Sequence, residues 1–343
     1  MDKYIFFEAT AGATFEQGTE KILRNLSSFL DSELETGRHL VCSKVFLSDM
    51  LNQHDELLGS RLHRELSRVP CSVVGQAPLS GAKLAVLLMT AESDSGRLFK
   101  SVRLSAAEAA DADAYWQTIR LFEKYKTYLD AKSLDIRIHL VRTWLYISNI
   151  DITYAQVVKA RNDFFRQCGL TVDTHFVAST GIGAENSYAN ALVGIDFLAY
   201  DNICEEDKKY LKAPDLLNAT HEYGVAFERA TRVVTPCGRR IYVSGTASID
   251  NLGQVVYPGD VRLQVDRLLR NIQGLLNDGG ACLVQVSYFI VYVRDIADRG
   301  VVERMFKLRF PHTPSVIVHA KVCRPGWLVE AECVINDSDS NRS

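Results

Sequence analysis

The chain has 343 residues, of which 47% are hydrophobic and 24% are charged. This is an ordinary globular composition, and the length suits two or three units of about 100–150 residues. The net charge of −3 and the sequence pI of 6.3 argue against a protein that binds nucleic acid or an anionic membrane, because such proteins present a basic surface.

The first residues read Met-Asp-Lys-Tyr-Ile-Phe-Phe-Glu and lack the long apolar stretch of a signal peptide. No run of about 18 apolar residues occurs, so we expect a soluble, cytoplasmic protein. The eight cysteines show no CxxC spacing, which predicts free thiols in a reducing compartment. The eight histidines form no HxxxH or HExxH pair, so neither a metal site nor a cofactor is predicted.

Three stretches of the chain follow one template, which we place at residues 1–95, 96–205 and 206–343. In each stretch, an amphipathic helix precedes a strand that ends in a short polar turn; a second helix and two closing strands follow. The predicted first helices are Glu20–Leu30, Tyr115–Ala131 and Asp266–Leu276. The strands after them are Val45–Asp49, Val141–Asn149 and Val291–Asp295. The middle copy then has a helix at Ala155–Cys168 and closing strands at Thr174–Ala178 and Ala191–Tyr200, and Glu205–Tyr223 connects it to the last copy.

This repetition predicts an α+β protein of three mixed sheets, each covered by helices on one face. A sheet covered on one side must bury its other face against another body. Three copies in one chain can meet that need around a shared axis, as an intramolecular pseudo-trimer. We therefore expect a monomer, although further assembly is compatible with the sequence.

The segment Val316–Val334 contains two runs of alternating residues around Arg324-Pro325-Gly326, a sequence typical of a tight turn. It predicts a β-hairpin in which Lys321 lies opposite Glu330 and His319 opposite Glu332. Because side chains alternate along a strand, Glu330 and Glu332 share a face. That face either carries weak, solvated ion pairs or belongs to a functional site.

The other two copies provide an internal comparison. We align Glu330 with Val86 and Gly194, and Glu332 with Leu88 and Asp196. Only the last copy has an acid at the first of these positions, so the fold itself does not require Glu330. This favours a functional role for its carboxyl group.

The last copy resembles the RidA/YjgF family, whose subunits have a chorismate-mutase-like fold and form trimers with ligand clefts between subunits. The resemblance is carried by Val243-Ser-Gly-Thr-Ala-Ser-Ile-Asp250, by Tyr257-Pro-Gly-Asp260 with Gln264, and by the stretch Cys323–Glu332. The imine deaminases of that family use an arginine in the strand after the second helix. The corresponding stretch here, Pro314–Val318, has none, which argues against imine deamination.

The whole chain resembles the chorismatase group, which includes the 3-hydroxybenzoate synthases. The matching features are Ala178–Ala184, Tyr223 followed by Phe227-Glu-Arg-Ala230, Val243–Ile249, and Cys323-Arg324 seven residues before Glu330. This resemblance implies removal of pyruvate from chorismate, with Glu330 as the catalytic acid. It also associates Cys323 with formation of 3-hydroxybenzoate and implies arginines that bind the two carboxylates of chorismate.

Each candidate residue also has a structural interpretation. Cys323 either contacts the substrate ring or packs as a small apolar side chain. Arg229 and Arg161 are candidates for carboxylate binding, since guanidinium groups suit that task, but arginines are usually solvated. Arg142 interrupts an apolar strand, so it needs either a ligand or a structural ion pair. Tyr223, Gly245 and Thr246 are predicted cleft-wall residues, and Thr180–Gly183 is predicted to be a turn beside the cleft.

Three functions remain open from the sequence. The first is an enzyme that forms a hydroxybenzoate, with 3-hydroxybenzoate expected. The second is a chorismate hydrolase that forms a dihydroxycyclohexadiene carboxylate, and the third is a RidA-like protein that binds a small carboxylate without turning it over. In each case the expected partner is a small molecule.

Overall fold

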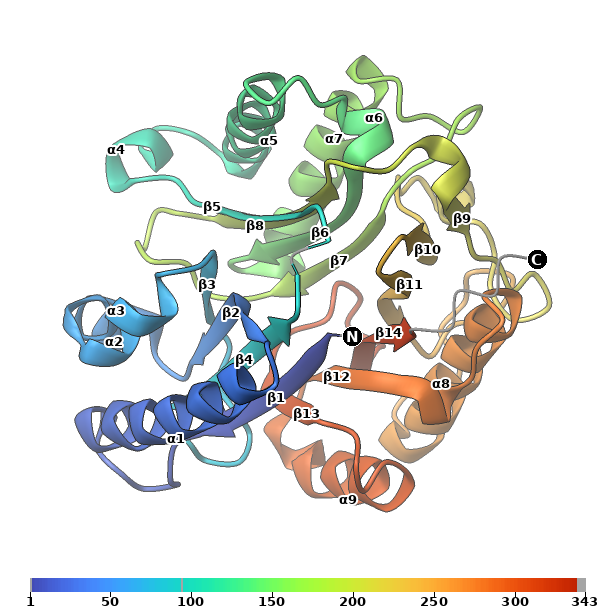
Figure 1. Ribbon diagram of the computed structural model, residues 1–343. Helices are drawn as coiled ribbons and strands as arrows, with labels where there is room; N and C mark the ends of the chain where they lie inside the picture. Colours follow the sequence, from blue (N-terminus) through green and yellow to red (C-terminus); the bar gives the residue numbers. More distant parts are fainter. Residues whose placement is uncertain (1, 94, 338–343) are drawn as a thin grey trace.

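The computed structural model describes residues 2–93 and 95–337. Three β-sheets surround a common centre, and the helices lie on the outside of this arrangement (Figure 1). Each sheet therefore has an outer face that packs against helices and an inner face that packs against the other two sheets.

The first sheet has the strand order β1-β4-β2-β3. Its strands are β1 (Lys3–Glu8), β2 (His39–Leu47), β3 (Cys71–Gly75) and β4 (Leu84–Ala91), and its helices are α1 (Phe15–Glu35), α2 (Met50–Gly59) and α3 (Arg61–Leu66). Helix α1 begins after a capping box, in which the Thr14 hydroxyl accepts a hydrogen bond from the Gln17 amide and the Gln17 side chain accepts one from the Thr14 amide.

The second sheet has the order β5-β8-β6-β7. Its strands are β5 (Arg97–Val102), β6 (Leu140–Ile147), β7 (Ala178–Gly183) and β8 (Val193–Tyr200). The helices of this unit are α4 (Ala106–Ala109), α5 (Ala114–Asp130), α6 (Ile136–His139) and α7 (Ile150–Gln167). Residues Thr174–Ala178, predicted to form a closing strand, precede β7 almost entirely, so the prediction was several residues too early.

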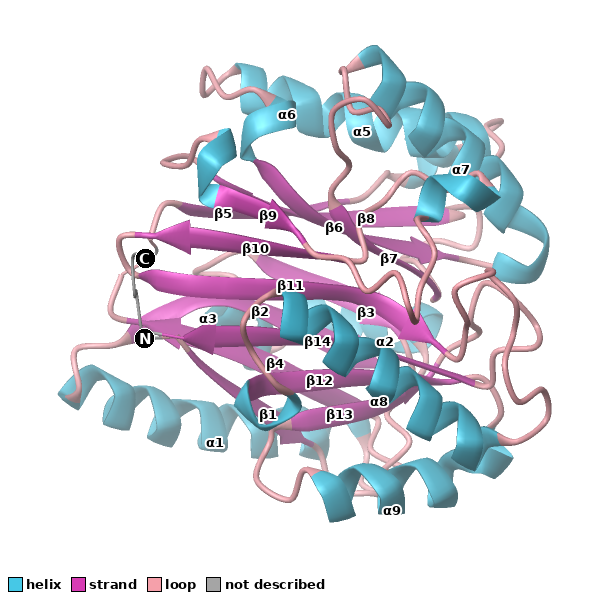
Figure 2. Ribbon diagram, turned by 90° about the vertical axis from the view of Figure 1, so that its right-hand side faces the viewer, coloured by secondary structure: helices cyan, strands magenta, loops and turns pink. Residues whose placement is uncertain are grey.

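The third sheet has six strands in the order β13-β12-β14-β11-β10-β9. They are β9 (Lys208–Tyr210), β10 (Ala230–Thr235), β11 (Gly238–Ala247), β12 (Val286–Val293), β13 (Ser315–His319) and β14 (Val329–Asp337). Helices α8 (Val261–Asp278) and α9 (Arg299–Arg309) cover its outer face (Figure 2). Short 3₁₀ helices occur at Glu205–Asp207 (η1), Thr220–Tyr223 (η2), Leu283–Gln285 (η3) and Ile296–Asp298 (η4).

The three units follow the same path, which confirms the predicted α+β fold with three RidA-like repeats. Each unit contributes four equivalent strands, and in the third sheet these are β11 to β14. The second and third of the four, in chain order, pair in parallel, and the other neighbours pair in antiparallel fashion. The third sheet adds β9 and β10 at one edge.

The inner faces of the three sheets form one shared hydrophobic core. It contains Phe46 and Leu87 from the first sheet, Tyr146 from the second, and Tyr292 from the third. Side chains that point outward from the first and second sheets belong to separate cores beneath their own helices.

Charged side chains also join the three units near the chain's beginning. The Asp2 carboxylate is buried and binds two guanidinium groups, Arg97 of β5 and Arg240 of β11, with an Arg240 Nε–Oδ2 distance of 2.7 Å. Burial by itself raises the pKa of Asp2, but the hydrogen bonds from these two arginines outweigh that effect and lower it. The Asp2 carboxylate of the first unit thus contacts the second and the third units.

The predicted hairpin at Val316–Val334 is wrong, although its turn is present. The Trp327 amide donates to the Arg324 carbonyl at 3.0 Å, as a tight turn requires. However, β13 and β14 do not pair, because β12 lies between them, parallel to β13 and antiparallel to β14. The predicted pairs of Lys321 with Glu330 and His319 with Glu332 are therefore absent.

The strand register also corrects the alignment of the first copy. In β4, Ala85 and Leu87 occupy the inner-face positions that Glu330 and Glu332 occupy in β14, and Val86 and Leu88 point toward the helices instead. The predicted alignment of Glu330 with Val86 and of Glu332 with Leu88 was therefore wrong by one residue. The prediction of Gly194 and Asp196 for the second copy agrees with the register.

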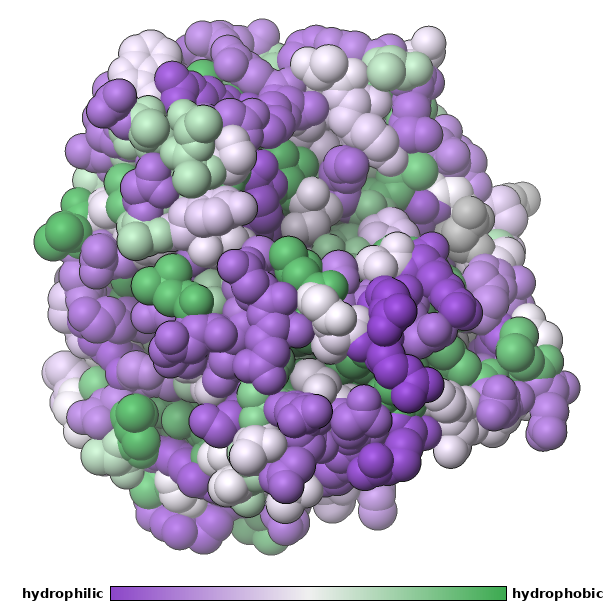
Figure 3. Space-filling model, turned by 90° about the vertical axis from the view of Figure 1, so that its left-hand side faces the viewer, coloured by the Kyte–Doolittle hydropathy of each residue, from purple (hydrophilic) through white to green (hydrophobic). Residues whose placement is uncertain are grey.

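The surface of the molecule over the first and second units is mainly hydrophilic, with hydrophobic residues scattered among the polar ones (Figure 3). In the described part of the chain, no helix is both long enough and apolar enough to cross a membrane. The eight cysteines all lie within the described residues, and each is a free thiol.

Candidate active site

A cavity of about 290 Å³ lies between the third sheet and the second unit. The third unit contributes β11, β14, the loop before β14, and the segment from η2 to β10, and the second unit contributes β7 and α7. Its lining residues are Tyr154, Ala155, Val158, Arg161, Ser179, Gly181, Tyr223, Gly224, Val225, Phe227, Arg229, Gly245, Ala247, Ile249, Cys323, Arg324, Trp327 and Glu330. Segments far apart in the sequence thus form one site.

Six of the eight predicted site residues line this cavity. They are Glu330, Cys323, Arg229, Tyr223, Gly245 and Arg161. Arg142 and Thr246 do not line it. The Thr180–Gly183 segment, predicted to be a turn, is part of strand β7, and Gly181 from it lines the cavity.

Glu330 reaches the cavity because of its position in β14. It lies opposite Ala247 of β11 and Tyr292 of β12, and its side chain is only 4% exposed. Gly245 makes room for it, since a Cβ atom at that position would overlap the Glu330 carboxyl. Burial, followed by the nearby charge of Glu332, raises the pKa of Glu330 to about 8. Glu330 is therefore mainly protonated at neutral pH.

Glu332 lies on the same face of β14 as Glu330 and is even more buried. Residues of the second unit hold its carboxylate. Its Oε2 atom is 3.0 Å from Arg142 Nη2 and accepts a hydrogen bond from the Thr180 hydroxyl at 2.6 Å. Trp144 Nε1 donates to its Oε1 atom at 2.7 Å. These contacts fix the Glu332 carboxyl beside Glu330, whose pKa is raised by burial and then by the charge of Glu332.

Arg142 was predicted either to bind the substrate or to form a structural ion pair. Its position supports the ion pair and not substrate binding. Arg142 is fully buried in β6, where Nη1 donates to the Val243 carbonyl at 2.7 Å and Nη2 pairs with Glu332. Thr246 is likewise buried and does not line the cavity, and its hydroxyl donates to the Ser244 carbonyl at 2.9 Å.

Three guanidinium groups line the cavity. Arg161 is 3% exposed, and its Nε and Nη2 atoms have no hydrogen-bond partner among residues 2–93 and 95–337. Arg229 donates from Nη2 to Asn218 Oδ1 at 3.1 Å, and Arg324 donates from Nη1 to the Gly253 carbonyl at 2.8 Å. Burial lowers the pKa of Arg161 and that of Arg229. A buried guanidinium with free donors is well suited to bind an anion.

Aromatic rings hold these arginines in place. The Arg229 guanidinium lies 5.5 Å from the ring centres of Tyr223 and Phe227, and that of Arg324 lies 5.0 Å from Tyr223 and 4.7 Å from Trp327. Such contacts stabilise a cation while leaving its N–H groups available.

Cys323 lies on the same cavity wall. Burial raises the pKa of its thiol to about 12, and the charge of Glu330 acts in the same direction. The thiol is therefore neutral at physiological pH, which suits a packing contact with a ligand rather than nucleophilic attack.

Sequence reasoning missed several lining residues, notably Tyr154, Phe227, Arg324 and Trp327. Phe227, Arg324 and Trp327 lie inside the motifs that carried the resemblance, so a closer reading of those motifs would have found them. Tyr154 is on α7, which approaches the third unit only in the folded chain, and its local sequence gives no signal.

The equivalent place at the seam between the second and first units is filled by protein atoms. Gly194 occupies the position of Glu330, and a Cβ atom added there would meet Asn186 Oδ1 and the Arg103 side chain. Arg103 Nη1 binds Asp196 at 3.0 Å. In the described residues, no group of three or more His, Cys, Asp or Glu side chains is placed to hold a metal ion.

Comparisons with known proteins agree with the resemblance seen in the sequence. Residues 225–336 match the family model Endoribonuclease L-PSP. A chorismatase from Streptomyces hygroscopicus is 30% identical over 219 residues, which cover 57% of this chain and 61% of the relative. A chorismatase from Streptomyces rapamycinicus is 30% identical over 214 residues, covering 57% of this chain and 64% of the relative. Each match thus spans less than two thirds of the relative's length.

A solved chorismatase structure extends the comparison to the whole chain. It superposes with a TM-score of 0.68 and 20% sequence identity, covering 98% of both chains. This protein therefore resembles chorismatases in sequence and has the chorismatase fold throughout.

Proposed function

We propose that this protein is an enzyme that removes pyruvate from chorismate and forms a hydroxybenzoate, with Glu330 as the general acid. The observation that carries the proposal is the shared location of a buried carboxyl group with a pKa of about 8 and three guanidinium groups in one cavity. An acid that holds its proton at neutral pH beside several cations suits a dianionic substrate that must be protonated. The sequence resemblance to chorismatases supports the same substrate.

In the proposed mechanism, Arg161, Arg229 and Arg324 bind the two carboxylates of chorismate. The Glu330 carboxyl then transfers its proton to the methylene carbon of the enolpyruvyl ether. This step creates an oxocarbenium ion at the ether carbon, and the Glu330 carboxylate that remains balances part of its charge. A water molecule adds to the ether carbon and returns a proton to Glu330, and cleavage of the bond from that carbon to the bridging oxygen releases pyruvate and leaves a 3,4-dihydroxycyclohexadiene carboxylate. Loss of the C4 hydroxyl and the C3 hydrogen as water then forms the aromatic ring and returns the water consumed in the first step.

The proposed product is 3-hydroxybenzoate. Chorismate and the sum of 3-hydroxybenzoate and pyruvate have the same atoms, so this route consumes no water overall. Cys323 is proposed to contact the ring and favour this outcome, because its neutral, buried thiol packs against an apolar surface. The role of Cys323 rests on the resemblance to the 3-hydroxybenzoate synthases.

Incubation of the purified protein with chorismate tests the proposal. Pyruvate is measured by a coupled enzymatic reaction, and the ring product by chromatography against 3-hydroxybenzoate. We expect equal amounts of the two products. Pyruvate at background level, with folding established by circular dichroism, contradicts the proposal, and chorismate binding without turnover would identify a binding protein instead.

A chorismate hydrolase is the second candidate function. Its reaction consumes one water and leaves a non-aromatic dihydroxycyclohexadiene carboxylate. Because this product lacks the absorbance of a benzoate ring, the spectrum of the separated product distinguishes the two reactions.

A further inference from the structure

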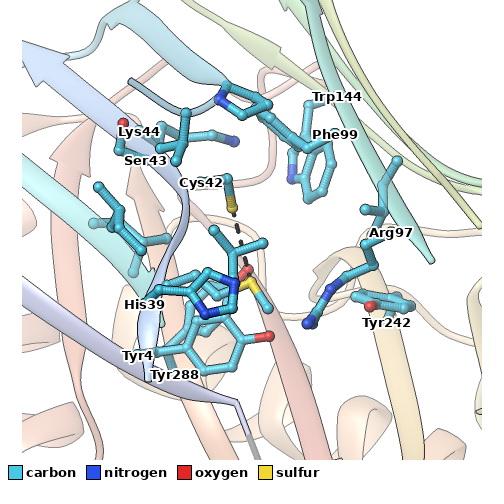
Figure 4. A pocket seen from close by; sticks show the side chains of 17 residues that line it. Tyr4, His39, Cys42, Ser43, Lys44, Arg97, Phe99, Trp144, Tyr242 and Tyr288 are labelled. Atoms are coloured by element: carbon cyan, nitrogen blue, oxygen red, sulfur yellow. Dashed lines mark hydrogen bonds between the residues drawn. The ribbon is translucent and has the colours of Figure 1, made fainter. Parts of the chain in front are cut away.

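A second cavity of about 330 Å³ lies where all three sheets meet (Figure 4). It shares no lining residue with the candidate active site. Its lining includes residues at or just before the beginnings of β2, β3 and β5, where His39 and Pro70 are exposed, and buried residues such as Lys44, Trp144 and Leu198. Its volume falls within the range of about 300–1,000 Å³ that is usual for small-molecule sites.

Aromatic side chains form much of its wall. Tyr4 and Tyr288 lie side by side with ring centres 4.8 Å apart, and Phe99 and Trp144 meet edge to face at 6.2 Å. Figure 4 shows these two pairs on different sides of the cavity. Rings that present their faces and edges to an open space are suited to contact a planar aromatic molecule.

Lys44 and Arg97 are two buried cations that line the cavity, and Arg97 is bound to Asp2. The Lys44 side chain is 7% exposed, its Nζ atom donates to the Tyr146 hydroxyl at 2.5 Å, and it lies 3.5 Å from Asp196 Oδ2. The same atom is 4.4 Å from the ring centre of Trp144, within the cavity wall. An ammonium group has three N–H donors, and these two polar contacts use at most two of them.

The charges around Lys44 favour an anion. Asp196 serves both Lys44 and Arg103, and Glu332 is paired with Arg142. By residue type, these five side chains comprise three cations and two anions. Burial lowers the pKa of Lys44, and the charges of Asp196 and Glu332 oppose this lowering. A surplus positive charge next to a mainly apolar cavity is stabilised by a negative group placed in that cavity.

We propose that this cavity binds a planar aromatic monocarboxylate of the size of benzoate. The ring lies between the Tyr4–Tyr288 pair and the Phe99–Trp144 pair, and the carboxylate accepts a hydrogen bond from Lys44. The proposal requires no turnover and does not depend on the proposed function.

Met89 provides a site-specific reporter for the test. It lines the cavity, and its Sδ atom lies 3.8 Å from Cys42 Sγ, a contact drawn as a dashed line in Figure 4. The protein is labelled with [methyl-¹³C]methionine, the Met89 signal is assigned with Met89→Leu, and benzoate is titrated into the full chain. We expect the Met89 methyl signal to shift until saturation. The signals of Met50 and Met305, which lie in other parts of the core, stay in place.

Two comparisons test the role of the charge. Benzyl alcohol has the same ring without the carboxylate, and we expect it to bind wild-type protein roughly tenfold more weakly or worse, because it lacks a charge-assisted hydrogen bond. Lys44→Gln is expected to weaken benzoate binding by a similar factor. Lys100→Gln, which changes an exposed lysine on β5, is the matched control and leaves binding unchanged.

The ligand comparison in wild-type protein keeps the test decisive if Lys44→Gln fails to fold. The absence of a saturable Met89 shift with benzoate overturns the site. Equal affinities for benzoate and benzyl alcohol overturn the assignment to a carboxylate. Loss of chorismate turnover has no bearing on either result, because binding is measured directly.

Discussion

Glu330 combines three properties at the scale of a single residue: it is buried, it lies beside another acid, and it lines a cavity that contains arginines. We expect Glu330→Gln to reduce pyruvate release by about 10²- to 10⁴-fold, the usual contribution of a general acid. The amide has nearly the same shape but cannot supply the proton. The rate is measured at saturating chorismate, and a rate equal to that of wild-type protein would refute the role of Glu330.

The raised pKa of Glu330 also makes a pH-dependent prediction. Between its ordinary pKa of 4.5 and its folded value of about 8, the folded protein binds a proton that the unfolded chain has lost. The unfolding free energy of wild-type protein should therefore fall relative to Glu330→Gln as pH rises through this range, by up to about 1.4 kcal/mol per pH unit. Urea denaturation of both proteins at several pH values measures the difference. Activity should decline above about pH 8 as the acid loses its proton.

Arg161 is predicted to bind a substrate carboxylate with its unpartnered donors. We expect Arg161→Met to raise KM about tenfold or more, because a charge-assisted hydrogen bond is lost while the length of the side chain is kept. Arg166→Met is the matched control on the same helix, since the Arg166 side chain is 72% exposed and pairs with Asp163 at the surface. Similar KM values for both variants would contradict the assignment.

Single residues were predictable from sequence where chemistry and repetition agreed. Glu330 stood out because the other copies have Ala85 and Gly194 at its inner-face position, so the comparison held despite the one-residue alignment error. Arg142 was recognised as a charge that needs a partner, but its partner Glu332 is 190 positions away in sequence and only the fold brings them together. The free donors of Arg161 depend on packing that no local pattern encodes.

At the scale of elements, strand β14 belongs to two environments. Its outward side chains, such as Val329 and Ala331, alternate with Glu330 and Glu332, which face the second unit. The sequence predicted this alternation and the turn before it. It could not predict which strand β14 pairs with, because alternation and turn chemistry are equally compatible with a hairpin and with insertion beside β12.

Arg142 of β6 and Glu332 of β14 form a buried ion pair between the second and third units. Removing one partner of this pair is expected to destabilise the protein. We expect Arg142→Met to lower the unfolding free energy by about 3–5 kcal/mol, because it leaves Glu332 buried without its cation. Adding Glu332→Gln to Arg142→Met should recover part of this loss. Urea denaturation measures both effects, and an equal or larger loss in the double variant would show that the pair is not the cause.

At the scale of the whole molecule, the three sheets depend on one another because their inner faces form a common core. The boundaries at residues 95 and 205 remain a prediction. If they are correct, residues 206–343 expressed alone have a helix-covered sheet with an uncovered apolar face. We expect this fragment to self-associate, as measured by light scattering after size-exclusion chromatography. A stable, monomeric fragment would show that the inner face needs no partner.

The side chain of Arg103 has a consequence for protein engineering. It lies between the first and second units, at the position equivalent to the candidate active site, so replacing it with a smaller residue would open space beside Gly194 and Asp196. With Asn186 also replaced by a smaller residue, an acid introduced at position 194 would occupy the place equivalent to that of Glu330. The repeated fold thus provides a second position at which an active site can be designed.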